Sequence, residues 1–292
     1  MKLPPLNSLP ILEKAAALAA AAGFEIYAVG GCVRDWAMGK VSEDIDFLVS
    51  GDAVALVEAL SREYGGKYQK FGPFQTVRFF PAAWGRLDFA RFRKETYARP
   101  AALPATEPAN TVLEDLGRRD FACNAMAVRL DGPGAFELID PYGGLQDIRA
   151  GTLRVLHEKS FEDDPTRVYR AARFAGRFGW RLEDGTSSLL AAAVEGGTPG
   201  LLSRERLRNE LIKILAEKDP LPALELLREA GALRFFHPAF AYSREALAGE
   251  TFRLRLAGIA RLMGGAGGEF LAGLNLSRRE TADLQALAAG QP

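Results

Sequence analysis

The chain has 292 residues, of which 48% are hydrophobic and 25% charged, and its formal net charge is zero. This composition is typical of a globular protein with room for two or three modules, and the balanced charge argues against binding nucleic acid by bulk electrostatics. Cys32 and Cys123 are too few and too isolated for a disulfide framework or a zinc site, which favours a reducing compartment. Ala15–Ala22 is apolar but too short to span a bilayer, so we expect a cytoplasmic protein without membrane contact.

Hydrophobic periodicity divides the first part of the chain into short helices and strands. Apolar residues at helical spacing predict helices over residues 10–22, 33–38 and 52–64. Alternating or continuous apolar runs predict strands over residues 24–29, 44–49, 68–71, 76–80 and 86–92. Because strands follow one another with few helices between them, we predict an α+β domain with a mixed or antiparallel sheet.

The segment after these strands has a different character. Glu95–Asn110 is rich in proline and lacks periodicity, which predicts a long loop of the kind that is usually functional. Residues 114–128 are expected to be helical ahead of Val128. Two short strands, at 136–139 and 153–156, are expected on either side of a turn at 140–144.

Beyond residue 150 the pattern becomes helical. Apolar spacing predicts four helices, over residues 164–178, 203–217, 221–231 and 252–263. Gly264–Gly268 is expected to be a flexible hinge, followed by one or two short helices.

One stretch of the first domain carries the strongest chemical pattern. Gly30 and Gly31 follow an apolar run and predict a tight turn at which the backbone can approach a phosphate, with Arg34 just beyond. Asp44 and Asp46 stand two residues apart in a predicted strand, so their side chains should face the same side. Paired carboxylates bind Mg²⁺ together with substrate phosphates. Alone, the aspartate pair also fits a solvated strand edge, but the neighbouring glycine turn and arginine favour a metal site.

Two further features of this domain leave alternatives open. Asp88, on a later predicted strand, either completes a carboxylate cluster or is an ordinary strand residue. Arg118 and Arg119 either neutralise a triphosphate or form a surface charge pattern at a helix start.

A row of arginines marks the start of the helical part. It comprises Arg167, Arg170, Arg173, Arg177 and Arg181, at steps of three or four residues, although Gly176 and Gly179 weaken the helical prediction for the last two. Stacked like charges destabilise a helix, so we expect an anionic partner such as the phosphates of a nucleotide or an RNA end, rather than water alone. Asp164 and Arg167 together offer hydrogen-bond acceptors and a donor fork that can read the edge of a base, or they form a plain ion pair.

These motifs, in this order, resemble the class II tRNA nucleotidyltransferase and bacterial poly(A) polymerase family. The resemblance rests on five groups of residues: Gly30–Asp35 with Asp44–Asp46, Arg118–Ala125, Asp140–Gly144 with Asp147, Asp163–Phe174, and Glu205–Leu215. It covers roughly residues 24 to 217. Small departures from the family pattern are Asp163 in place of a glutamate, and Ala122 in place of the threonine in the segment that many relatives have as Thr-x-Asn-Ala and that here is Ala122–Ala125.

The resemblance implies a polymerase-β-like nucleotidyltransferase head at residues 1–150, a helical neck at 151–218 that selects the nucleotide, and a helical body at 219–292 that contacts RNA. It implies that Asp44 and Asp46 are catalytic and hold two Mg²⁺ ions. The residues that it implies for nucleotide binding are Gly31, Arg34, Arg119, Asp164, Arg167, Arg170 and Arg173.

The resemblance further implies transfer of CMP and AMP from CTP and ATP to the 3′ end of tRNA, building CCA. An enzyme that adds only CC or only A, a poly(A) polymerase, and a catalytically silent RNA-binding protein remain as alternatives. The segment at 95–110 lies where the family has its flexible loop. Because the chain ends at Pro292, we expect the family's tail domain to be absent, and the sequence leaves the oligomeric state open.

Overall fold

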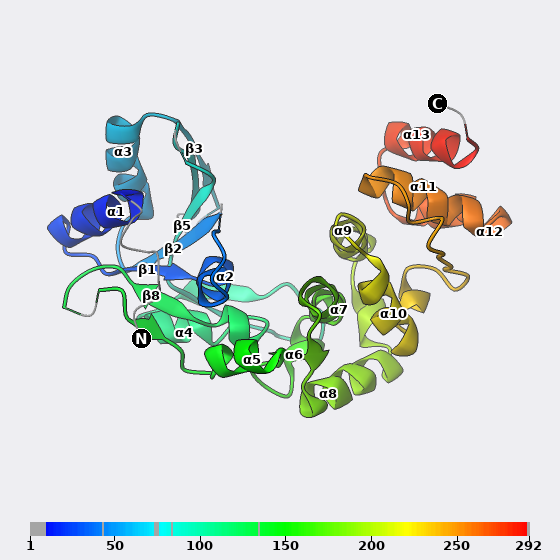
Figure 1. Cartoon of the computed structure of the whole chain (residues 1–292), viewed down its shortest axis with the longest axis horizontal. Coiled ribbons are helices and arrows are strands. Elements are labelled where there is room, and N and C mark those ends of the chain that lie inside the picture. The colour runs from blue at the N-terminus through cyan, green and yellow to red at the C-terminus, as the bar shows by residue number, and fades with distance from the viewer. Residues whose placement is uncertain (1–9, 43, 73–75, 83, 134, 291–292) are drawn as a thin grey trace. The chain divides into compact units, whose positions relative to one another are not determined.

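The computed structural model describes residues 10–42, 44–72, 76–82, 84–133 and 135–290 (Figure 1). The chain forms two compact units. Unit 1 contains residues 1–96, 104–150 and 154–156, and unit 2 contains residues 97–103, 151–153 and 157–292.

Unit 1 is built on one large sheet, as the strand-rich pattern predicted. Seven of its described strands follow the order β3-β4-β5-β2-β1-β8-β9. β2 and β5 pair in parallel and the other neighbours pair antiparallel, so the sheet is mixed. The strands are β1 (Ile26–Val29), β2 (Ile45–Val49), β3 (Lys67–Phe71), β4 (Thr76–Phe80), β5 (Leu87–Arg91), β8 (Ala127–Arg129) and β9 (Leu138–Ile139).

The main core of unit 1 lies on one face of this sheet, beneath α1 (Pro10–Ala21) and α3 (Ala53–Tyr64), and α2 (Gly31–Ala37) also contributes residues to it. Alternation along the strands directs Phe47 and Phe89 into this core, where their rings stack with centroids 4.4 Å apart. Asp52 caps α3 by accepting hydrogen bonds from the first turn.

The opposite face is covered over only part of its width. A smaller cluster there joins Tyr27, Val29 and Leu48 to residues of α4 (Val112–Leu116). Thr111 and Glu114 close the start of α4 as a reciprocal capping box. The cluster does not cover this face at β3 and β4, and the side chains that these two strands place on it are polar or exposed.

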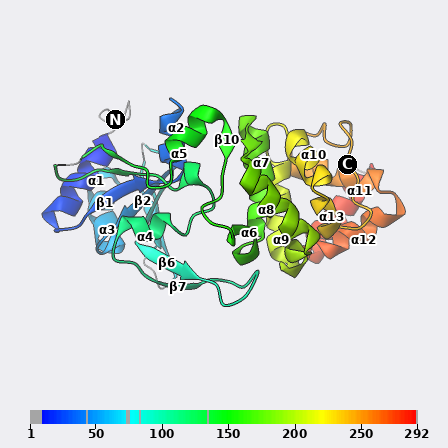
Figure 2. The ribbon, with the colours of Figure 1, turned by 90° about the horizontal axis from the view of Figure 1, so that it is seen from below.

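The predicted long loop at 95–110 was wrong. Arg93–Thr96 (β6) and Ala105–Pro108 (β7) pair antiparallel, and Figure 2 shows the two strands side by side. The prolines did not prevent pairing because Pro108 is at the end of β7 and Pro104 precedes it, positions where a missing N–H is tolerated.

The predicted helix at 114–128 was also wrong in its length. α4 ends at Leu116, a single 3₁₀ turn follows at η2 (Ala122–Asn124), and the chain then enters β8. Asp120 accepts a hydrogen bond from the backbone N–H of Phe121, a local contact that competes with helix continuation. The strand expected at 136–139 is limited to β9, since Phe136 has a φ of 64°.

Unit 1 closes with α5 (Gly144–Ala150), which we had not predicted. Asp140 accepts hydrogen bonds from the backbone N–H groups of Gly144 (2.7 Å) and Leu145 (2.9 Å) and so starts this helix. Asp147 pairs with Arg154 at 3.0 Å. The aspartates of this motif therefore organise a turn and a helix.

Unit 2 is almost entirely helical, as predicted. Its only described sheet pairs β10 (Thr152–Leu153), shorter than the expected strand at 153–156, with β11 (Arg181–Leu182). Its α-helices are α6 (Ser160–Asp163), α7 (Thr166–Phe178), α8 (Asp184–Glu195), α9 (Arg204–Leu215), α10 (Leu221–Glu229), α11 (Phe252–Leu262), α12 (Gly265–Gly273) and α13 (Arg278–Ala288), and its 3₁₀ helices are η3 (Thr198–Leu201) and η4 (Ala232–Phe235).

Two details of unit 2 differ from the sequence predictions. The hinge expected at Gly264–Gly268 is the first half of α12, where Gly267 lets the helix approach the backbone of Ala260. Gly176 weakened the helix prediction for α7, but a Cβ there would lie 2.9 Å from the backbone nitrogen of Ala223, so the glycine allows α7 to pack on α10. Tertiary packing thus overrides the low helix propensity of glycine.

Among the residues that the structure describes, none of the helices has the length and apolar character needed to cross a membrane.

Candidate active site

Two carboxylates lie side by side near the start of two adjacent parallel strands in unit 1. Asp46 on β2 is in register with Asp88 on β5, so both side chains lie on the same face of the sheet. β2 begins at Ile45, which corrects the prediction that Asp44 is itself a strand residue. Asp44 lies just before the strand with its side chain 55% exposed.

Two arginines pair with this acidic centre, defined as Asp44, Asp46 and Asp88. Arg78 holds Asp88 with two hydrogen bonds, Nε–Oδ1 at 2.9 Å and Nη2–Oδ2 at 3.2 Å. Arg86 lies between the other carboxylates, with Nη2 2.9 Å from Asp44 Oδ2 and Nε 3.4 Å from Asp88 Oδ2.

Asp46 has the most unfavourable position for a negative charge. Burial raises the pKa of its carboxyl, and the charges of Asp88 and Asp44 raise it further, while Arg119 and Arg86 oppose the increase. The acidic centre is therefore only partly compensated by the protein. An added cation would favour the ionised form of Asp46.

The glycine turn lies directly between β1 and α2. Gly30 has a φ of 76° and a ψ of −128°, a conformation that disfavours side chains, and a Cβ there would overlap the guanidinium of Arg119. A Cβ on Gly31 would meet Arg34 Nη2 at 3.6 Å, an ordinary contact. Gly30 is thus required by this packing, and Gly31 is not.

Arg34 is buried and held in place by two partners. Its Nε donates to Asp35 Oδ1 at 2.9 Å, and its Nη1 donates to Asn124 Oδ1 at 2.7 Å. Asn124 in turn donates from Nδ2 to Asp120 Oδ1 at 3.0 Å. We had not assigned a role to Asn124 or Asp120, although both belong to the motif at 118–125.

The paired arginines at 118 and 119 converge on a carboxylate that the sequence analysis missed. Asp115 is fully buried on α4, and its oxygens lie 3.0 Å from Arg118 Nη2 and 3.2 Å from Arg119 Nη2. Arg118 also pairs with Glu95 at 2.9 Å. Arg118 therefore stabilises the fold, whereas Arg119 is close enough to Asp46 to influence its pKa.

The chemistry of the acidic centre fits a hard divalent cation. Within the described ranges of the chain, no group of three or more histidine, cysteine or acidic side chains is arranged to hold a metal ion, and Asp88 is engaged by Arg78. Asp46 and Asp44 are the candidate donors, and Asp44 would exchange its ion pair with Arg86 for the metal ion. Mg²⁺ commonly uses one or two carboxylates, with waters and substrate phosphates completing its shell.

The cysteines take no part in this chemistry. Cys32 and Cys123 are buried free thiols, and burial raises the pKa of Cys32 to about 12. A thiol with so high a pKa is not a nucleophile at neutral pH.

In unit 2, Asp164 lies at the entrance to α7 rather than within it, which corrects the predicted start of this helix. Its Oδ1 accepts hydrogen bonds from Thr166, through N at 3.0 Å and Oγ1 at 2.6 Å, and from Arg206 Nη2 at 2.6 Å. Arg206 on α9 also donates to the carbonyl of Ala101 at 3.1 Å. Arg206 lies in the motif at 205–215, but its partner could not be deduced from spacing.

The arginine row divides into different environments. Arg167 and Arg173 are buried on α7, and Arg181 lies outside the helix on β11. Glu217 compensates the middle of the row, 3.3 Å from Arg173 Nη1 and 2.8 Å from Arg177 Nε. Burial, with the neighbouring arginines Arg170 and Arg177, lowers the pKa of Arg173, and Glu210 and Glu217 oppose this change.

An aromatic ring also contributes to this row. The guanidinium carbons of Arg170, Arg173 and Arg177 lie 5.4, 4.5 and 5.7 Å from the centroid of Phe174. Cations over an aromatic face are attracted by its quadrupole. Glu217 and the ring of Phe174 therefore supply, from within the chain, part of the compensation that we expected from an anionic partner.

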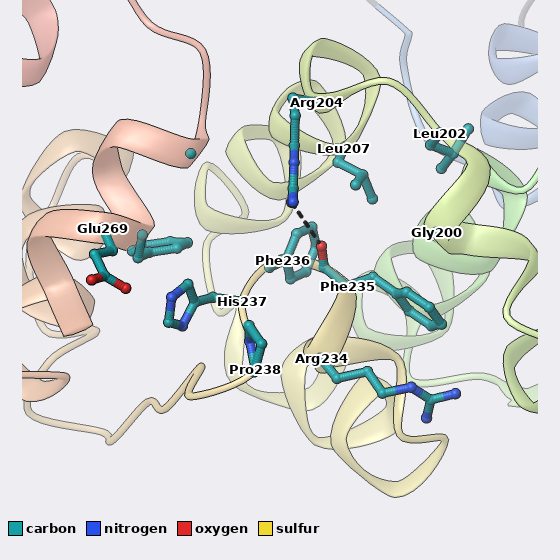
Figure 3. Close-up of a pocket in the computed structure, with 12 residues that line it drawn as sticks. Gly200, Leu202, Arg204, Leu207, Arg234, Phe235, Phe236, His237, Pro238 and Glu269 are labelled. Atoms are coloured by element: carbon teal, nitrogen blue, oxygen red, sulfur yellow. Dashed lines mark hydrogen bonds between the residues drawn. The ribbon is translucent and has the colours of Figure 1, made fainter.

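A separate cavity of about 350 Å³ lies among α9, η4 and α12 of unit 2 (Figure 3). Arg204 points toward the carbonyl oxygen of Phe235, 3.4 Å away, and Arg234 donates to the carbonyl of Val194 at 2.6 Å. The Nδ1 of His237 accepts from the backbone N–H of Ala239 at 3.1 Å. None of the predicted site residues lines this cavity.

Unit 1 thus has a mixed sheet with an aspartate pair next to a glycine turn and buried or ion-paired arginines. This arrangement defines a polymerase-type head domain. In agreement, residues 26–154 match the family model of the poly A polymerase head domain, and residues 201–243 match the model described as the probable RNA and SrmB-binding site of polymerase A.

Known proteins extend this similarity along the chain. An A-adding tRNA nucleotidyltransferase of Geobacter sulfurreducens is 41% identical over 73% of this chain and 24% of its own length. The solved structure of a CCA-adding enzyme in an apo form gives a TM-score of 0.84 at 31% identity, covering 99% of this chain and 72% of that one. The Thermotoga maritima CCA-adding enzyme complexed with tRNA-CCA gives 0.78 at 29%, covering 99% and 71%.

The chain therefore belongs to the class II tRNA nucleotidyltransferase and bacterial poly(A) polymerase family, as its motifs indicated. It spans about a quarter to a half of the length of the curated relatives that it matches.

Proposed function

We propose that this protein transfers nucleotides, without a template, from nucleoside triphosphates to the 3′ end of tRNA. The observation that carries the proposal is the acidic centre, where half-buried Asp46 stands beside Asp88 with its pKa raised. Such an arrangement is costly for stability alone and is expected where a cation is bound.

Asp44 and Asp46 would hold Mg²⁺, two ions in the reacting complex. These ions would supply electrostatic stabilisation while the terminal hydroxyl of the RNA attacks the α-phosphate and pyrophosphate leaves. Arg34 and Arg119 would bind the triphosphate, and Gly31 would offer its backbone to it. Asn124 would orient Arg34, because its side-chain oxygen accepts from Nη1 at 2.7 Å.

Base selection would rest on Asp164 and Arg167, with Arg170 and Arg173 helping to hold the nucleotide. Arg206 fixes one oxygen of Asp164, which leaves the carboxylate with a defined orientation toward a base. Replacing Arg167 by alanine should reduce discrimination against GTP and UTP. Unchanged selectivity in that variant would contradict the base-reading role.

Our first choice of product is the complete CCA end, built from CTP and ATP. Addition of A alone is a second candidate, favoured by the names of three curated relatives, 37–42% identical, that are A-adding tRNA nucleotidyltransferases. Two further relatives at 37% identity are named multifunctional CCA proteins, which favours the first choice. The presence of Asp44, Asp46 and Arg34 speaks against a silent RNA-binding protein.

Three tRNA transcripts separate these products. They end before CCA, after the first C and after CC, and each is incubated with CTP, with ATP and with both. Extension of all three to CCA supports the first choice, whereas extension of the CC-ended transcript alone indicates an A-adding enzyme. Long A tracts would indicate a poly(A) polymerase, and no extension of any transcript would contradict nucleotidyl transfer.

A further inference from the structure

The outer strands of the unit 1 sheet expose aromatic and basic side chains on the same face as the acidic centre. β3 is an edge strand of this sheet, and its five residues are all exposed. The side chains of interest, which we call the edge patch, are Lys67, Gln69, Phe71, Arg78 and Phe80.

Strand register shows that these side chains share one face. Gln69 is opposite Arg78, Arg78 is opposite Asp88, and Asp88 is opposite Asp46, which makes a row across four strands. Arg78 contacts residues to either side of it, because it pairs with Asp88 at 2.9 Å and its guanidinium lies 5.4 Å from the centroid of Phe71.

The other face of β3 has a different environment. Tyr68 Oη donates to Glu58 Oε1 at 3.4 Å, and Lys70 Nζ lies 3.1 Å from the same oxygen. Glu58 belongs to α3, which covers the main core. Because side chains alternate along a strand, Lys67 and Phe71 point away from α3.

The edge patch combines exposed rings with positive charge. Phe71 is 37% exposed and Phe80 47% exposed. Lys67 makes no ion pair with any residue in the described part of the chain. Exposed aromatic rings with interleaved cations are the features of surfaces that bind single-stranded nucleic acid, because bases stack on the rings and phosphates meet the cations.

We propose that the edge patch binds the single-stranded 3′ end of the RNA acceptor and directs it toward Asp46. This inference rests on the proposed function, which requires the terminal hydroxyl to reach the acidic centre. The row from Asp46 to Gln69 crosses three strand spacings, about 14 Å, a distance on the scale of a few nucleotides. RNA phosphates are repelled by the acidic centre, so cations beside it are needed to retain the strand.

The two faces of β3 provide matched variants for the test. Phe71→Ala removes a ring from the edge patch, and Tyr68→Ala removes a ring that is equally exposed, at 37%, from the opposite face. Lys67→Ala and Lys70→Ala make the same comparison for charge. We expect Phe71→Ala to raise KM for a CC-ended tRNA transcript about tenfold, the effect of losing one base stack, with KM for ATP unchanged. Tyr68→Ala should change neither constant by more than about twofold.

Direct binding separates this inference from the proposed function. Fluorescence anisotropy of a labelled short single-stranded RNA is measured with the full chain and with each variant. If the protein transfers no nucleotide but Phe71→Ala and Lys67→Ala weaken RNA binding selectively, the edge patch stands and the proposed function fails. If Phe71→Ala and Tyr68→Ala behave alike in KM and in binding, the inference is overturned. It is also overturned if Phe71→Ala converts a dimer to a monomer in analytical ultracentrifugation and leaves RNA binding unchanged. The edge patch would then bind a second copy of the chain.

Discussion

The acidic centre of unit 1 and the arginine row of unit 2 are both clusters of like charge, but the protein treats them differently. On α7, Glu217 and the ring of Phe174 offset the charges of Arg173 and Arg177. In the acidic centre, Arg78 pairs with Asp88 and Arg86 with Asp44, yet the pKa of Asp46 stays raised although Arg119 and Arg86 oppose the increase. Glu217 thus offsets part of the arginine row from within the chain, although the pKa of Arg173 stays lowered, and in the acidic centre the pKa of Asp46 stays raised. We expect the acidic centre to gain more from an added ion of opposite charge.

This difference shows how far a run of like charges in this sequence indicates a bound ligand. A row of arginines suggests an anionic ligand, yet part of the anion is a glutamate 40 or more residues further along the chain. A half-buried carboxylate whose pKa stays raised despite nearby arginines is the stronger indication of a ligand. The following experiments test that contrast, beginning with the largest expected effect.

Removing the acidic centre should abolish the reaction. We expect Asp44→Ala/Asp46→Ala to lower the rate of nucleotide incorporation on the order of 10³-fold, because preorganised electrostatic stabilisation is lost. Incorporation of labelled ATP or CTP measures the effect. The control variant Glu58→Ala/Glu63→Ala also removes two negative charges from unit 1, but from α3. Comparable activity in the two double variants would show that the acidic centre is not catalytic.

Removing the internal anion of the arginine row should mainly affect stability. Glu217 and Arg173 are about 10% exposed, and a buried charge left without its partner costs about 3 kcal/mol. We therefore expect Glu217→Gln to lower the free energy of unfolding in urea by about that amount. Asp184→Asn is the control, because its ion pair with Arg181 lies at the solvent-exposed surface and should contribute far less to stability. Equal losses in both variants would mean that Glu217 does not balance the row.

Releasing Asp164 should affect nucleotide choice more than stability. Arg206→Ala removes the guanidinium that fixes Asp164, and the loss of a charged hydrogen bond should reduce the preference for the correct nucleotide about tenfold. The ratio of kcat/KM for ATP and GTP measures this preference. Arg204→Ala, two residues earlier on α9 and directed at Phe235, should leave it unchanged. A similar loss in both variants would argue for a general effect on the helix.

The smallest effect concerns stability and pH without divalent metal. Because the folded state raises the pKa of Asp46 above 3.8, the folded protein binds this proton more tightly than the unfolded chain. Ionised Asp46 therefore lowers stability as pH rises from 3.8 through its raised pKa. With a chelator present, Asp46→Asn should have a higher Tm than the native protein at pH 7, and the difference should disappear below pH 3.8. A lower Tm at pH 7 would show that the ionised carboxylate is already satisfied.

Much of the fold was predictable because it follows from local periodicity. Alternation in β2 and β5, and helical spacing in α3, α9 and α10, are properties of neighbouring residues. The prediction failed where distant contacts decide: the β6–β7 hairpin needs its partner strand, and Gly176 sits in α7 because α10 lies against it. The candidate site residues that we predicted remain predictions of function.

By itself, the sequence determined the order of the motifs, the family, and the presence of Gly30, Arg34, Asp44 and Asp46 in one stretch of chain. Only the tertiary structure decided which charged side chains have an ion-pair partner within the chain. It placed Asp115 under Arg118 and Arg119, and it set Arg206 on Asp164. The physical reason is that periodicity fixes which way a side chain faces on its own element, whereas its ion-pair partner comes from whichever element the fold packs beside it.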